Sequence, residues 1–150
     1  MRSPILYHIQ SAIIDFLKQD PIGKTLSIFN IFNCSFDEWI LRKISSAQPL
    51  QLGIGCPFPI ETCSYLSVPS WRKLALTALL IQRNHSIKTN NFIDLAEQLS
   101  FSISHTNFST ERCQWTFVLN EKQPWQWLEL KNKTALQIHF TTQDFSTFDA

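Results

Sequence analysis

The stretch Ser70-Trp71-Arg72-Lys73-Leu74-Ala75-Leu76-Thr77-Ala78-Leu79-Leu80-Ile81-Gln82-Arg83 carries the strongest apolar pattern in the chain. Its apolar residues fall into two neighbouring stripes at helical spacing. The first stripe holds Trp71, Leu74, Ala75, Ala78 and Leu79, and the second holds Leu76 and Leu80. Because the two stripes cover most of a helix circumference, the pattern predicts a central helix that is buried on several sides and ends at Asn84-His85-Ser86.

Further amphipathic helices are predicted on both sides of this segment. In the N-terminal region apolar residues recur every three or four positions, at Ile5, Leu6, Ile9, Ile13, Phe16 and Leu17. This helix is expected to end at Asp20-Pro21, because proline cannot continue it. Another is expected to begin at the capping-box sequence Ser35-Phe36-Asp37-Glu38 and to run to Ile44. A last one follows the central segment, with Phe92, Leu95, Ala96 and Leu99 on one face.

The C-terminal third changes from helical to twofold periodicity. Cys113, Trp115, Phe117 and Leu119 occupy alternate positions, as expected for a strand. A second strand is predicted over residues 125–131, after a turn at Glu121-Lys122-Gln123-Pro124, and a third around Leu136, Ile138 and Phe140. The short turns predict a three-stranded antiparallel β-meander. A short strand is also expected at residues 50–56, and periodicity leaves residues 26–32 open between helix and strand.

The predicted fold is therefore α+β. N-terminal and central amphipathic helices are expected to pack on the C-terminal three-stranded antiparallel β-meander, because so small a sheet is marginal without a cover. The 150 residues match the size of one domain, and no internal repeat or linker interrupts them. We therefore expect a single globular domain over residues 1–150.

The composition limits the classes of function. Hydrophobic residues make up 44% of the chain, and thirteen basic residues face twelve acidic ones, for a net charge of +1. The charge gives no basic stripe of the kind that nucleic-acid binders use, so nucleic acid is not the expected partner. Near-zero net charge removes the repulsion that keeps proteins apart, which favours association with another protein or with copies of itself.

The sequence also favours a cytoplasmic location. No apolar run approaches the length of a membrane span, and the start of the chain is expected to form the amphipathic helix described above rather than a signal peptide. Without an export signal, the four cysteines Cys34, Cys56, Cys63 and Cys113 are expected to be reduced and mostly buried thiols.

Motifs for catalysis, metal and nucleotide binding are not found in the sequence. Cys56 and Cys63 are seven positions apart, which is not the spacing of a structural zinc site. Three glycines cannot build a phosphate-binding loop in the usual way. Cys56 is the best candidate nucleophile, but no activating base is visible. We therefore expect no catalytic residue, no metal and no cofactor.

The strongest candidate site is an aromatic and aliphatic strand. Trp125 and Trp127 share one face and Leu128 and Leu130 the other, so the strand must be covered on both sides by its own helices or by a partner. Either the two tryptophans fill the core, or they form a partly exposed interface of the kind that is rich in aromatic residues. The predicted function is a non-catalytic, cytosolic protein-binding or adaptor subunit of a larger complex, with these four residues at the interface.

Two alternatives stay open at this point. Residues 92–102 have the spacing of the first helix of a helix-turn-helix, and residues 115–131 could supply the wing of a winged-helix DNA-binding protein. The stretch that should hold the recognition helix, residues 104–110, contains no lysine or arginine. The other alternative is a small enzyme that uses a cysteine or a histidine.

Overall fold

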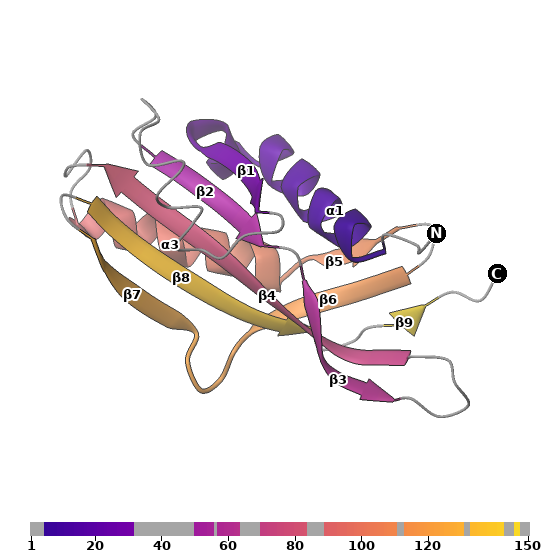
Figure 1. Ribbon diagram of the computed structural model, residues 1–150. Helices are drawn as coiled ribbons and strands as arrows, with labels where there is room; N and C mark the ends of the chain where they lie inside the picture. The colour runs from indigo at the N-terminus through magenta and orange to yellow at the C-terminus, as the bar shows by residue number, and fades with distance from the viewer. Residues whose placement is uncertain are drawn as a thin grey trace.

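The computed structural model describes residues 5–31, 50–55, 57–63, 70–83, 89–110, 113–130, 133–142 and 146–147. Their helical elements are α1 (Ile5–Gln19), the 3₁₀-helix η1 (Pro21–Thr25) and α3 (Thr89–Ser104). Their strands are β1 (Ser27–Ile31), β2 (Leu50–Gly55), β3 (Phe58–Cys63), β4 (Ser70–Arg83), β5 (Asn107–Ser109), β6 (Cys113–Leu119), β7 (Trp125–Leu130), β8 (Lys133–Thr142) and β9 (Ser146–Thr147). The described residues thus form a curled mixed sheet with two α-helices (Figure 1).

The central helix predicted for residues 70–83 is wrong, because this segment is the long strand β4. Along one edge, β4 pairs antiparallel with β2 and then with β3. Along its other edge it pairs antiparallel with β8, from Ala75 opposite Thr141 to Arg83 opposite Lys133. The segment is central, as its apolar content indicated, but it is the middle of a sheet.

The predicted three-stranded meander is also wrong in its pairing, although all three of its strands exist. β7 does not lie between β6 and β8, as a meander requires. Instead β6 and β7 pair with the same edge of β8, one after the other: Leu119 lies opposite Phe140, and Trp125 lies opposite Ile138. They act as one long strand that is interrupted by residues 120–124. The other strands extend the sheet far beyond a meander.

The remaining strands complete the sheet on both sides. β1 pairs parallel with β2, which settles residues 27–31 as a strand and confirms the strand expected near Leu50. At the opposite end, β5 and β9 both pair antiparallel with β6. The correct description is therefore a mixed sheet that dominates the fold, not a helix-rich α+β arrangement over a small meander.

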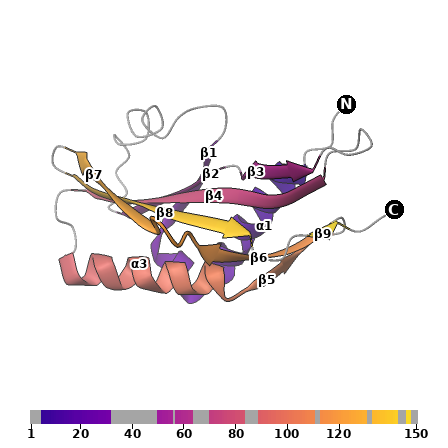
Figure 2. The ribbon, with the colours of Figure 1, turned by 90° about the horizontal axis from the view of Figure 1, so that it is seen from below.

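Both described α-helices were predicted, and both cover one face of the sheet. In α1, Ile9, Ile13 and Leu17 are buried while His8 and Asp15 are exposed, as expected for an amphipathic helix. α3 extends along the sheet (Figure 2) and buries Phe92, Ala96, Leu99 and Ile103. After α1, the carboxylate of Asp20 accepts a hydrogen bond from the Ile22 backbone N–H over 3.0 Å and so caps η1.

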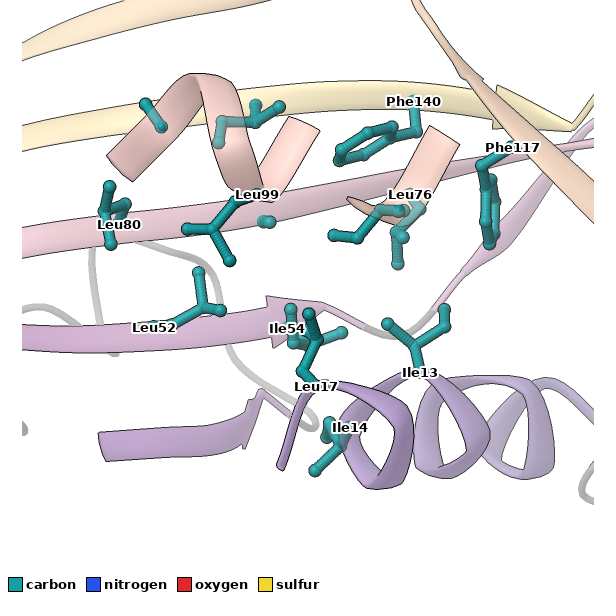
Figure 3. Close-up of a cluster of buried hydrophobic side chains, with 14 of the residues drawn as sticks. Ile13, Ile14, Leu17, Leu52, Ile54, Leu76, Leu80, Leu99, Phe117 and Phe140 are labelled. Carbon is teal, nitrogen blue, oxygen red and sulfur yellow. The ribbon is translucent and has the colours of Figure 1, made fainter. Parts of the chain in front are cut away.

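Strand register explains how the core forms. Leu52 of β2, Leu80 of β4 and Leu136 of β8 lie side by side across three strands, and Ile54, Ala78 and Ile138 form the next row. These rows face the buried residues of α1 and α3 in one hydrophobic cluster (Figure 3). At its far end, Phe108 stacks on Trp115 with ring centroids 5.5 Å apart. Burying each of these large side chains stabilises the fold by about 1.5–3 kcal/mol.

The opposite face of the sheet changes character along its length. Leu79, Ile81 and Ala135 point away from the helices and are nevertheless buried. Further along the same face, Thr77 and His139 are half-buried polar residues. β4 is therefore apolar on both faces at one end, which is why its sequence does not alternate.

Some predictions fall outside the described residues. The helix expected between Ser35 and Ile44, together with Cys34 and Cys56, lies there. Cys63 and Cys113 belong to β3 and β6, but their side chains are likewise outside the description.

Candidate functional site

The strand β7 places the predicted interface residues at an edge of the sheet. Among the described strands, β7 pairs with β8 alone, so its other edge has no neighbour in that part of the chain. An edge strand presents backbone N–H and C=O groups that a further strand can pair with. We use the name β7 surface for Trp125 and Trp127 with the ring of Phe92 beneath them, together with Leu128 on the other face of the strand.

Trp125 fixes β7 to the helix beneath it. Its side chain is half-buried against the core, and its indole Nε1 donates a hydrogen bond to the Ser100 Oγ of α3 over 3.2 Å. The Ser100 hydroxyl in turn donates to the Ala96 carbonyl oxygen over 2.8 Å. The indole N–H is therefore satisfied inside the protein. Trp125 therefore ties β7 to α3, and its indole N–H already has a hydrogen-bond acceptor within the protein.

Trp127 is the exposed member of the surface. It lies on the same sheet face as Trp125, opposite Leu136, and the residue is 48% exposed. Its ring contacts Phe92, which is fully buried, with centroids 6.0 Å apart and planes tilted by 36°. A large aromatic ring on a rigid apolar base loses little conformational entropy when it is covered, which is typical of interface anchors.

The two leucines of the predicted interface are placed differently. Leu128 is half-buried on the other face of β7, opposite Ala135. Leu130 ends the strand opposite Lys133, and its side chain lies outside the description. The structure thus brings Trp125 and Trp127 together with Phe92 on one face. Phe92 was predicted as a core residue of its helix, but not as a neighbour of the interface tryptophans, because its position in the helix pattern pointed only to the core.

A network of hydrogen bonds lies where residues 120–124 interrupt the long strand formed by β6 and β7. The backbone N–H of Asn120 donates to the His139 carbonyl oxygen over 2.9 Å, and the His139 N–H donates to the Pro124 carbonyl oxygen over 2.8 Å. The Asn120 side-chain oxygen accepts from the backbone N–H of Lys122 and of Gln123. One residue of β8 therefore anchors both ends of the loop, and Asn120 shapes its turn.

Next to this loop, His139 and Thr77 form the pair of side chains that most resembles a catalytic base and its hydroxyl partner among the described residues. The His139 Nδ1 lies 3.2 Å from the Thr77 hydroxyl across the β4–β8 ladder. Burial lowers the pKa of His139, which favours the neutral imidazole. The pair lines a hollow of about 420 Å³ together with Lys122 and Gln126. Among the described residues that line this hollow, none is a carboxylate that could orient the imidazole, as a triad requires.

The described residues hold neither a metal-binding cluster nor a membrane-spanning helix. In that part of the chain, no three His, Cys, Asp or Glu side chains come close enough to hold a metal ion. No helix among the same residues is both long and apolar enough to cross a membrane.

The helix-turn-helix reading is not supported by the local structure. Residues 92–102 are helical, as predicted, within α3. The segment that follows forms the strand β5 (Asn107–Ser109) and pairs with β6, so a recognition helix does not form at residues 107–109.

Comparison with known proteins identifies a shared fold. No protein family and no curated protein matches the sequence. A chain in the solved structure of the virion of a native gene transfer agent (GTA) particle is similar, with a TM-score of 0.68. The match covers 96% of this chain and 100% of that chain at 9% sequence identity. At this identity the likeness concerns the fold alone.

Proposed function

We propose that this protein is a non-catalytic structural or adaptor subunit of a larger protein complex, and that it contacts another chain through the β7 surface. The observation that carries the proposal is the exposed ring of Trp127 on the buried base of Phe92, at an edge of the sheet. Interface centres are enriched in such aromatic residues, and the edge adds backbone groups for a partner strand.

Similarity in fold supports the same reading. The matching chain belongs to a gene transfer agent particle, and the match extends over nearly the whole of both chains. A protein of this shape is therefore compatible with a place inside a multi-protein assembly. The partner in the proposal is a second copy of this chain or a different protein.

The chemistry of the chain fits this proposal better than an enzyme or a DNA-binding protein. The Thr77–His139 pair lacks a carboxylate neighbour among the described residues of its hollow, and the net charge is only +1. The proposal gives nucleic acid no role. It places the protein in the cytoplasm, where four cysteines would stay reduced.

Sedimentation velocity over a wide concentration range tests the proposal with the full chain, alone and after mixing with any candidate partner. We expect a concentration-dependent complex whose formation moves the tryptophan fluorescence to shorter wavelength. Trp127→Ala should weaken it by about 2 kcal/mol, or roughly 30-fold in Kd. The matched control is Tyr7→Ala, which removes another exposed aromatic ring from α1. A chain that stays monomeric with every candidate, or equal losses in both variants, would overturn the proposal.

A further inference from the structure

The most exposed aromatic side chain among the described residues is not on the β7 surface but near the other end of α3. Phe101 is 63% exposed. It lies nine residues from Phe92, or about 14 Å along the helix axis, so it belongs to a separate surface. Exposing so large an apolar ring to water does not stabilise the fold.

One face of the Phe101 ring is covered and the other is open. The imidazole of His105 stacks on it, with centroids 4.1 Å apart and planes within 17°. The Nδ1 of His105 lies 3.1 Å from the Phe101 carbonyl oxygen and 3.2 Å from the Ser104 hydroxyl, which fixes the imidazole in place. Since a stacked neighbour covers only one face, the exposure of Phe101 comes from its other face and its edge.

Phe101 also lines a hollow between η1 and α3. The hollow has a volume of about 450 Å³, inside the usual range of ligand-binding clefts. The residues that line it include the apolar side chains of Pro21, Ile22 and Phe101. Glu97 precedes Phe101 by one helical turn and therefore lies on the same face of α3.

The charge of the hollow has one sign. Asp20 and Glu97 both line it, and none of the described residues that line it is basic. Asp20 is held at the start of η1, where its Oδ1 accepts the Ile22 N–H. An uncharged apolar occupant would take water from both carboxylates without giving a counter-charge, which is unfavourable. An occupant that fits must therefore carry a positive charge, together with a planar or apolar group that can cover the Phe101 ring.

We propose that the hollow formed by Asp20, Ile22, Glu97 and Phe101 receives an arginine side chain of a partner protein. A guanidinium group stacks on an aromatic face and forms paired hydrogen bonds with carboxylates, and its carbon stem covers apolar surface. Phe101 supplies the ring, Glu97 and Asp20 supply the charge, and Pro21 and Ile22 supply the apolar wall. This contact is separate from the β7 surface and does not depend on it.

A titration with N-acetyl-arginine amide, followed in ¹H–¹⁵N NMR spectra of the full chain, tests this inference. The probe should cause saturable chemical-shift changes in the backbone amide signals of η1 and of the second half of α3. The uncharged isostere N-acetyl-citrulline amide should cause none there. Phe101→Ala and Phe101→Leu should each weaken binding about two- to fivefold, and Phe101→Trp should keep it. Because Phe101 is exposed, these variants should fold normally.

A pair of double variants separates a built site from general attraction. Asp20→Asn with Glu97→Gln removes both charges of the hollow and keeps the η1 cap, since asparagine caps as well as aspartate. Asp15→Asn with Asp94→Asn removes two exposed charges from α1 and α3 outside the hollow. The first pair should abolish the shifts and the second should leave them. Equal effects of both pairs, shifts with citrulline amide, or no saturable shift would overturn the inference, whatever becomes of the β7 surface.

Discussion

Trp127 lies against Phe92 with ring centroids 6.0 Å apart, yet Phe92 is fully buried while almost half of Trp127 is exposed. The pair joins the core of the protein directly to its surface. Trp125, two residues earlier, shows the alternative fate of a tryptophan on this strand, because its indole N–H is bonded to Ser100. The strand thus has one tryptophan that is bonded to α3 and one whose ring is about half exposed.

Leu79 tests the position of β4. Leu79→Ala should lower the free energy of unfolding by about 2–5 kcal/mol, the usual range for a large-to-small change in a core. The reason is its full burial on the sheet face away from the helices, in a strand that is paired on both edges. Chemical denaturation of the wild type and the variant measures the change. A midpoint that barely moves would place Leu79 at the periphery.

That central position illustrates what the sequence could not decide. Leu74, Leu76, Ala78 and Leu80 alternate as a strand requires, but Leu79 and Ile81 fill the positions between them. A strand buried on both faces loses its alternation, and a nearly continuous apolar run then satisfies helical spacing as well. Alanine, leucine, arginine and lysine also favour helices, and the fourteen residues exceed an ordinary strand. Only the pairing with β2 and β8 resolves the ambiguity.

Asn120 tests the loop that interrupts the long strand. Asn120→Ala should destabilise the protein by about 1–2 kcal/mol, because the Lys122 and Gln123 N–H groups lose their acceptor. Asn120→Asp is the matched control, since a carboxylate oxygen can accept both hydrogen bonds. Thermal unfolding of the three proteins measures the difference. If the aspartate variant loses as much stability as the alanine variant, the turn does not depend on this acceptor.

His139 gives the stability a defined pH dependence. Because burial lowers its pKa in the folded protein, the unfolded chain binds this proton more readily. Its contribution is fully present above the ordinary histidine pKa of about 6.5 and is lost as the pH falls through the lowered value. His139→Gln keeps a polar partner for Thr77 and removes the titration. The variant should therefore lose less stability than the wild type between about pH 7 and about pH 5. Parallel curves would contradict this assignment.

The candidate sites were predictable only in part, again for physical reasons. The sequence pointed to Trp125 and Trp127, because both faces of their strand are apolar. It could not tell which of them is covered, since that depends on Ser100 and Phe92 of α3, which lie far away in the chain. The hollow at Phe101 was not predicted, because the residues that line it come from two segments, residues 20–22 and 97–102, that lie far apart in the sequence. The hollow forms only when α1 and α3 fold onto the same face of the sheet.

The order of strands was likewise beyond local patterns. Short turns normally join neighbouring strands, so β6, β7 and β8 were expected to form a meander. The loop at residues 120–124 instead returns the chain to the same edge of β8. The two backbone hydrogen bonds to His139 make this possible, and nothing in the alternation of β6 and β7 reveals them.

Photo-crosslinking at position 127 tests the central claim most directly. A benzoylphenylalanine residue replaces Trp127 in one protein and Tyr7 in a control, and each is irradiated within its assembled complex. We predict that the group at position 127 forms its main crosslink to another protein chain, while the group at position 7 gives little or none. If the crosslinks from position 127 stay within the same chain, or match those from position 7, the β7 surface is not the contact that joins this protein to its complex.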